Sequence, residues 1–227
     1  MRSIWSVLAV LLLATAPAAA EWRSPITGNA WKQPYAPAFE PMLVSDALQR
    51  RIAAAVLRAR GMKLSPAAPA KHVAASASDF KSTKGRPYVS KVLLSMFEDP
   101  KGTQLLPAVR KSIDEWETVS AFRKNNVAAA LGLAIYAALL RQKVTMTDTE
   151  LKELILAAND HLATRPEFVK LSAPQKQALY EMFLTTSSMI VLFGVTADDD
   201  PTDENSKAIA AELAAQVLAT VGYDPRK

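Results

Sequence analysis

The run from Val127 to Leu140 constrains the fold most, because almost all of its side chains are apolar. They cover nearly the whole circumference of a helix, and a helix that is apolar on every side is buried. The run is shorter than the roughly 20 residues that a transmembrane helix needs. It therefore predicts a helix at the centre of a bundle, with Asn125 or Asn126 as its N-cap.

Segments with one apolar face predict the helices that surround this central one. Thr147 and Glu150 form a capping-box pattern, as do Ser172 and Gln175, and Pro201 suits the first position of a last helix. No stretch alternates apolar and polar residues in the way of a strand. We therefore expect an all-α fold, a helical bundle of about five helices with a Pro/Ala-rich N-terminal arm. Helical patterns span residues 45–60 before the bundle, and residues 87–97, 103–118, 126–140, 147–165, 172–194 and 201–222 within it.

Composition divides the chain into three parts. Residues 1–20 have a positive start, an apolar stretch and three alanines ending at Ala20, which predict a secretory signal peptide. Residues 21–79 contain a proline-rich arm, a basic helix and an Ala/Ser/Pro-rich linker (65–78), and residues 80–227 contain the helical bundle domain. Cleavage near Ala20 would place the mature protein in the periplasm or outside the cell. We expect no transmembrane segment in the mature chain.

Charge, cysteine content and spacing exclude several classes of function. The net charge is +5, but Lys and Arg are spread among acids, which does not favour a nucleic-acid partner. Without cysteine the chain has no disulfide, thiol nucleophile or Cys-based metal site. His72, in the linker, and His161 are far apart in the sequence, and the acids of 198–204 lack EF-hand spacing, so that helix capping explains them better. No catalytic residue, metal ligand or cofactor is predicted.

Two polar spots are candidate binding positions. Asn125 and Asn126 precede the central helix, where one amide suffices as a cap and the other can bridge to a neighbouring helix. Lys176, Gln177 and Tyr180 lie early in a later apolar helix, and four small hydroxyl residues follow them. Such hydroxyls can bond to the carbonyl four residues back and let helices approach closely, so packing and ligand binding both remain explanations.

The basic helix expected at 45–60 is a candidate for surface contact. Arg50, Arg51 and Arg58 flank its apolar stripe. A helix of this kind can lie on an anionic membrane surface or dock on one end of the bundle. Because the stripe is rich in alanine, we expect weak membrane-surface contact at most.

Three motifs resemble a known family. They are the run Lys124-Asn-Asn-Val-Ala-Ala-Ala-Leu-Gly132, the run Ser172-Ala-Pro-Gln-Lys-Gln177, and a closing helix that ends in Gly222-Tyr-Asp224. Together they resemble an uncharacterised family of exported bacterial proteins, a domain of unknown function, over roughly Phe80 to Pro225. The resemblance implies an exported α-helical domain without an assigned activity.

These observations favour a non-catalytic binding or structural role in the cell envelope, with an unknown protein or other envelope component as partner. One alternative is a carrier that holds an apolar small molecule between its helices, in a cavity lined by Leu133, Tyr136, Tyr180 and Phe183. The other is a hydrolase that uses a pair of carboxylates. The acids available for such a pair are Asp114, Glu115, Glu117, Glu150, Glu153, Glu167 and Glu181.

Overall fold

The computed structural model describes residues 43–64, 71–83, 85–97 and 100–224. The predicted signal peptide (1–20), the proline-rich arm and residues 65–70 of the linker lie outside the described residues. The described part contains eight α-helices, one 3-10 helix and no strand, which confirms the all-α bundle but exceeds the expected five helices. In chain order the elements are α3 (Asp46–Ala59), α4 (Val89–Met96), η2 (Pro100–Leu105), α5 (Leu106–Trp116), α6 (Val127–Arg141), α7 (Asp148–Ala163), α8 (Pro166–Val169), α9 (Ala173–Asp199) and α10 (Glu204–Thr220).

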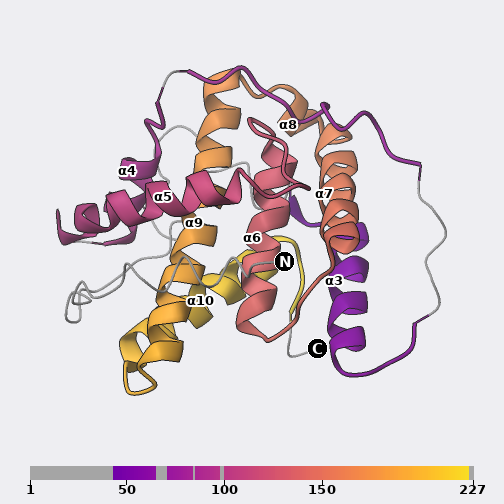
Figure 1. The fold of residues 1–227 in the computed structure, drawn as a ribbon. Helices are drawn as coiled ribbons and strands as arrows, with labels where there is room; N and C mark the ends of the chain where they lie inside the picture. The colour runs from indigo at the N-terminus through magenta and orange to yellow at the C-terminus, as the bar shows by residue number, and fades with distance from the viewer. Residues whose placement is uncertain (1–42, 65–70, 84, 98–99, 225–227) are drawn as a thin grey trace.

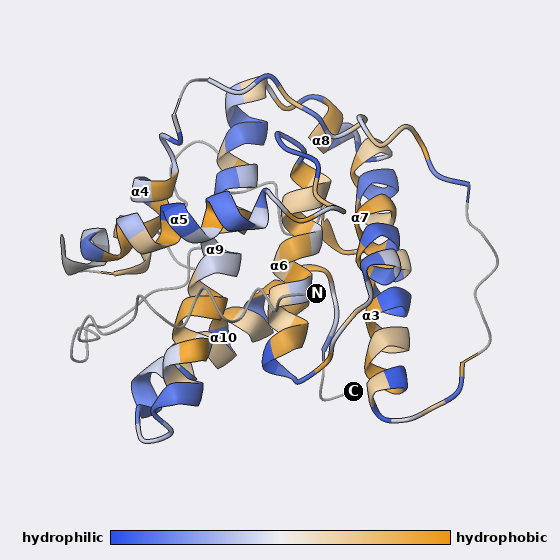
Figure 2. Cartoon of the chain, in the orientation of Figure 1, coloured by the Kyte–Doolittle hydropathy of each residue, from blue (hydrophilic) through white to orange (hydrophobic). Residues whose placement is uncertain are grey.

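Helices α6 and α9 form the centre of the bundle (Figure 1). They pack against each other, and α10 packs against both α6 and α9. Helix α7 covers another side of α6. As expected from its apolar circumference, α6 is buried along almost its whole length. Figure 2 shows hydrophobic residues along α6 and hydrophilic residues on the N-terminal part of α9. That polar end of α9 is where the candidate site lies.

Helix α9 is long and apolar enough to cross a membrane by length and composition, but 94% of its most apolar window is buried inside the protein. Two of its four small hydroxyl residues, Thr185 and Ser187, support the packing explanation, whereas the buried hydroxyls of Thr186 and Ser188 have no hydrogen-bond partner among the described residues. The Thr185 hydroxyl donates to the Glu181 carbonyl at 2.7 Å, and the Ser187 hydroxyl donates to the Phe183 carbonyl at 2.7 Å. Bonded in this way, short polar side chains can lie in a helix interface.

Local cap chemistry set most of the helix starts. Thr147 and Ser172 both form the expected capping boxes. Two boundaries were wrong. Helix α9 continues past Gly194, because this glycine admits the side chain of Arg141 instead of ending the helix: a Cβ there would lie 2.9 Å from the Arg141 Cδ. The last helix starts after Asp203, whose carboxylate accepts from the Ser206 amide at 2.9 Å, and not at the proline two residues earlier.

Two helical units flank the centre. Helix α3 lies on α7 and buries the stripe of Leu48, Ile52 and Val56, with Ser45 as its cap. Helices α4 and α5 lie against α9 on the opposite side (Figure 1). The cleft described below forms where the loops that lead into and out of α4 and α5 meet α9.

Residues 71–78, the described part of the linker that composition predicts at 65–78, are tied to the bundle by buried side chains. The Asn159 amide oxygen accepts from the Ser78 amide at 3.1 Å and from the Ser78 hydroxyl at 2.7 Å. Asn126 caps α6 by accepting from the Ala129 amide at 2.9 Å, and its own amide group donates to Asp79 at 2.8 Å. These bonds fix the course of the chain just before it reaches the cleft.

Candidate functional site

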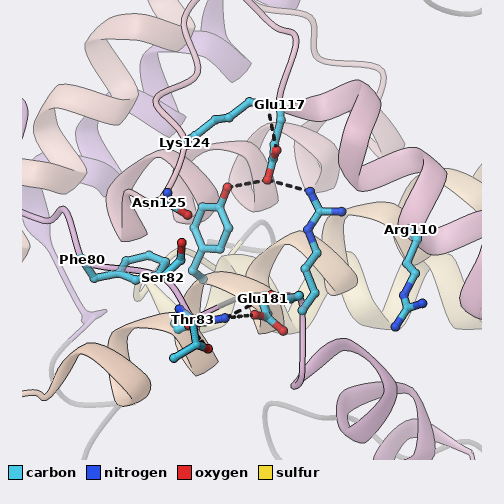
Figure 3. Close-up of a pocket in the computed structure, with 12 residues that line it drawn as sticks. Phe80, Ser82, Thr83, Arg110, Glu117, Lys124, Asn125 and Glu181 are labelled. Atoms are coloured by element: carbon cyan, nitrogen blue, oxygen red, sulfur yellow. Dashed lines mark hydrogen bonds and ion pairs between the residues drawn. The ribbon is translucent and has the colours of Figure 1, made fainter.

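A cleft of about 530 Å³ lies beside the N-terminal part of α9 (Figure 3). Four segments that are distant in the sequence form its walls. The lining residues are Phe80, Ser82, Thr83, Gly85 and Arg86 from the loop before α4, Arg110 and Glu117 from α5 and its C-cap, Lys124 and Asn125 from the loop before α6, and Gln177, Tyr180 and Glu181 from α9.

The Glu117 carboxylate is the meeting point of three donors. It accepts from the Tyr180 hydroxyl at 2.9 Å, pairs with the Arg86 guanidinium at 2.9 Å and pairs with the Lys124 ammonium at 3.2 Å (Figure 3). Burial, together with the negative charge of Glu117, raises the pKa of Tyr180. The phenol therefore stays protonated and acts as a donor, which cross-links α9 to the end of α5.

Glu181 is a second, more deeply buried carboxylate, only 1% exposed. One oxygen accepts from the backbone amides of Tyr88 and Val89, at 2.7 and 3.2 Å, and the other accepts from the Gln177 amide at 2.7 Å. Burial raises the pKa of Glu181 even though these hydrogen bonds act in the opposite direction. Because α4 has no side-chain cap of its own, Glu181 serves as its N-cap from another helix.

Gln177 ties the loop before α4 to α9. Its amide oxygen accepts from the Thr83 backbone amide at 2.8 Å and from the Thr83 hydroxyl at 2.9 Å. Its amide nitrogen is occupied by Glu181. A single buried glutamine therefore connects the exposed rim of the cleft to its base.

The structure brings together three of the five candidate binding residues. Asn125, Gln177 and Tyr180 all line the cleft. Asn126, next to Asn125, serves as the cap of α6 and faces residues 75–79. Lys176 lies over the ring of Phe168, 4.6 Å from its centroid, in a cation–π contact outside the cleft.

Two of the three candidate surface arginines are engaged within the protein. Arg51 pairs with Glu153 at 3.1 Å, and Arg58 pairs with Glu150, both on α7. The apolar stripe between them is buried in the structure, which corresponds to docking on the bundle, one of the two arrangements expected for this helix. Arg50 is exposed and has no side-chain partner among the described residues.

Neither histidine is among the residues that line the cleft. His72 packs against α7: its Nδ1 is 2.6 Å from the Asp160 carboxylate and its Nε2 is 3.3 Å from the Glu153 carboxylate. The hydrogen bond to Asp160 raises the pKa of His72 and so favours its protonated form, and the contacts with Asp160 and Glu153 tie this part of the predicted linker to α7. His161 is close to Arg165, with 3.5 Å between the ring Nε2 and the guanidinium Nε. Within the part of the chain that the structure describes, no group of three or more potential ligands has a metal-binding geometry.

Sequence reasoning missed three charged residues of the cleft as site residues. Glu117 was named only as one of seven acids available for a catalytic pair, and Arg86 and Arg110 were not singled out. Arg86 belongs to a loop and Glu117 to a helix end, so neither carries a periodic signal. They meet only because the loop before α4 crosses the polar end of α9. The sequence pattern of neither segment alone predicts this tertiary contact.

The fold and the cleft define a class: an all-α bundle with a preformed, charge-lined cleft at the polar end of its central helix. The chain belongs to the family of unknown function DUF6683, whose model matches residues 2–227. The match includes the N-terminal arm and the basic helix, which the resemblance from Phe80 onward left outside. Comparison with curated proteins and with solved structures finds no match.

Proposed function

We propose that the protein is a non-catalytic binding protein that is exported to the cell envelope and takes a small ligand in the cleft beside α9. The observation that carries this proposal is the convergence of side chains from four segments on a preformed concave surface. Binding sites of soluble proteins are typically concave, largely preformed and supplied with a few fixed polar groups. Here Gln177, Glu117 and Glu181 are fixed by their own hydrogen bonds before any ligand arrives.

The state of the two carboxylates favours binding over hydrolysis. A catalytic acid/base pair needs a carboxylate that can exchange a proton with the substrate or with a water molecule. The Glu117 carboxylate already accepts a hydrogen bond from Tyr180 and pairs with Arg86 and Lys124. The Glu181 carboxylate already accepts hydrogen bonds from two backbone amides and from Gln177. Both groups are thus placed to shape the cleft.

The apolar-carrier alternative gains less support from the described core. Of the four residues expected to line such a cavity, Tyr180 lines the cleft. Leu133 and Phe183 are almost fully buried within the packed core, and Tyr136 is partly buried against it. The cleft itself is lined mainly by polar and charged side chains, which suits a polar ligand better than an apolar one.

A blocking substitution tests the cleft. Ser82→Trp adds a bulky ring at the exposed rim, whereas Ala211→Trp adds the same ring on the exposed face of α10, outside the lining. Native mass spectrometry of protein purified from its own envelope should detect a co-purifying small molecule with the wild type and Ala211→Trp but not with Ser82→Trp. Equal retention by all three proteins would rule out the cleft as the site.

Export is tested separately, since the first 20 residues lie outside the described part. N-terminal sequencing of protein from the periplasm or medium should begin at Glu21. Ala20→Arg, which removes the small residue before the cleavage point, should accumulate as the uncleaved precursor. Recovery of the wild-type protein from the cytosol with Met1 or Arg2 at its N-terminus would contradict the export proposal.

A further inference from the structure

One end of the cleft presents neutral polar groups that the protein itself does not use. The Asn125 backbone carbonyl accepts from the Phe80 amide at 3.0 Å, whereas the Asn125 side-chain amide forms no hydrogen bond among the described residues. The hydroxyl of Ser82, two residues beyond Phe80, also has no partner in the described part of the chain. In Figure 3 these three lining residues lie next to one another. A carboxamide offers a donor and an acceptor side by side, and a hydroxyl can act as either, so both groups are available to a ligand.

Contacts with α9 hold this wall of the cleft in place. The ring of Phe80 packs edge-on against that of Tyr180, with 5.3 Å between the centroids. The Thr83 backbone amide donates to the Gln177 amide oxygen at 2.8 Å. Gln177 and Tyr180 are three residues apart on α9, which is about 4.5 Å along the helix axis. Ser82 therefore lies on a short segment anchored at both ends, over a span that one six-membered ring covers.

The backbone of Asn125 indicates that its side chain is not there for the fold. Its φ of 55° lies in the left-handed region, which glycine adopts without steric cost and which other residues adopt rarely. The cap of α6 is supplied by Asn126 and not by Asn125. A side chain that neither the turn nor the cap requires, held in a sparsely populated conformation on a cleft wall, points to a role in binding.

The charges at this end of the cleft are matched within the protein. Arg86 is held between Asp114 and Glu117, at 2.8 and 2.9 Å. Lys124 pairs with Glu117 at 3.2 Å, so that two cations face two carboxylates. Arg110 lies at the other end of the lining in Figure 3. The groups around Asn125 therefore favour a neutral polar ligand over an ion.

We propose that the ligand of the cleft is a neutral sugar, whose ring lies against Phe80 while two neighbouring hydroxyls bond to the Asn125 amide, one as donor and one as acceptor. This inference rests on the proposed function, because it names the ligand class of the same cleft. Neighbouring hydroxyls supply the donor and the acceptor that a carboxamide matches, and Ser82 can bond to a third. The C–H groups on one face of a sugar ring suit the negatively polarised face of an aromatic ring.

The test is a titration of the purified mature protein, followed by amide chemical shifts. Methyl glucoside, methyl galactoside and N-acetylglucosamine are the neutral sugars. Tetrahydropyran carries the ring without hydroxyls, acetamide carries a donor and an acceptor without the ring, and glucuronate adds a negative charge. At least one neutral sugar should shift the amides of Phe80, Ser82 and Asn125, with a Kd of about a millimolar, as expected for a ligand of this size. Its binding should be insensitive to ionic strength and weaker for all three comparison probes.

A matched pair of variants separates the Asn125 amide from its backbone. Asn125→Gly keeps the left-handed backbone and removes the amide, so it should weaken sugar binding by roughly tenfold, the effect of losing two hydrogen bonds. Lys143→Gly makes the same change at an exposed position with φ of 58° outside the lining and should leave the Kd unchanged. The two substitutions should shift the melting temperature equally little, because glycine fits both backbones.

The outcomes separate this inference from the proposed function. A markedly lower melting temperature for Asn125→Gly than for Lys143→Gly would assign the amide to the fold and overturn the inference. Equal Kd values for the two variants, or binding of acetamide, tetrahydropyran or glucuronate as tight as that of the best neutral sugar, would overturn it as well. The absence of shift changes with every neutral sugar would also overturn it, while co-purification of a ligand that Ser82→Trp removes would still support the binding function.

Discussion

Asn126 offers the sharpest test of how the chain before the cleft is held. Its side chain is 1% exposed, caps α6 through the Ala129 amide, and donates to the Ala75 carbonyl at 3.0 Å and to Asp79 at 2.8 Å. Asn126→Ser keeps a cap and loses both donated bonds, each contributing about 1 kcal/mol. Asn126→Ala also loses the cap, about 1 kcal/mol more. We therefore expect losses in unfolding free energy of about 2 and about 3 kcal/mol.

Asn126→Asp separates the cap from the donated bonds. Aspartate is as good a cap as asparagine, but its carboxylate faces that of Asp79 without the bridging amide hydrogen. At neutral pH it should be no more stable than Asn126→Ala, and it should gain relative to that variant as the pH falls and a proton is shared between the two acids. Urea unfolding followed by circular dichroism measures all four proteins. A neutral-pH stability of Asn126→Asp equal to the wild type would refute the assigned role of the amide group.

Variants at three further positions, His72, Glu181 and Gly132, test other contacts by thermal or urea unfolding. The Asp160 hydrogen bond raises the pKa of His72 from 6.5, so the stabilisation of the folded protein by protonated His72 is complete below about pH 6.5 and is lost as the pH rises through the folded-state pKa. His72→Gln should abolish this dependence of the unfolding free energy on pH. An unchanged dependence would assign it to another group. Glu181→Ala leaves two backbone amides at the start of α4 unpaired and should lower the free energy of unfolding by about 2–4 kcal/mol. Glu181→Gln keeps an acceptor and should lower it by less. Equal losses in the two variants would contradict the role of Glu181 as a cap. A Cβ on Gly132 would lie 2.5 Å from the Ile155 Cγ1, so Gly132→Ala should destabilise by about 1–3 kcal/mol despite its better helix propensity, and by less when Ile155→Ala is already present.

The parts of the fold that could be predicted depend on neighbours in the sequence. Ser45, Thr147 and Ser172 cap helices through amides three residues ahead, and the apolar circumference of α6 marks a buried helix by itself. The wrong boundary at Gly194 has a non-local cause. A glycine stops a helix when it adopts a positive φ, as Gly222 does at 81°, but Gly194 is small to accommodate a side chain from α6. Composition cannot distinguish these two uses.

The candidate site was only partly predictable for the same reason. Gln177 and Tyr180 stood out as polar residues in an apolar helix, and Asn125 as a second amide where one suffices. Each of these residues departs from the pattern of its neighbours in the sequence, and such a departure indicates a position with a specific contact. Arg86 and Glu117 carried none, because a charged residue in a loop or at a helix end is ordinary until a distant segment covers it. Their roles depend on tertiary contacts with α9.

The placement of polar groups in the core ties the cleft to the segment that precedes it. An apolar bundle needs no buried amides, yet Asn126, Asn159 and Gln177 are each at most 2% exposed. All three bond to the non-helical stretch between residues 74 and 83, which then becomes a wall of the cleft. Buried polar groups that are fully paired fix one arrangement of the chain, because any other arrangement leaves them unsatisfied. The hydrogen bonds of these buried amides thus hold the cleft wall in one conformation. A substitution at Asn159 should therefore disturb the cleft, although Asn159 is not among the residues that line it.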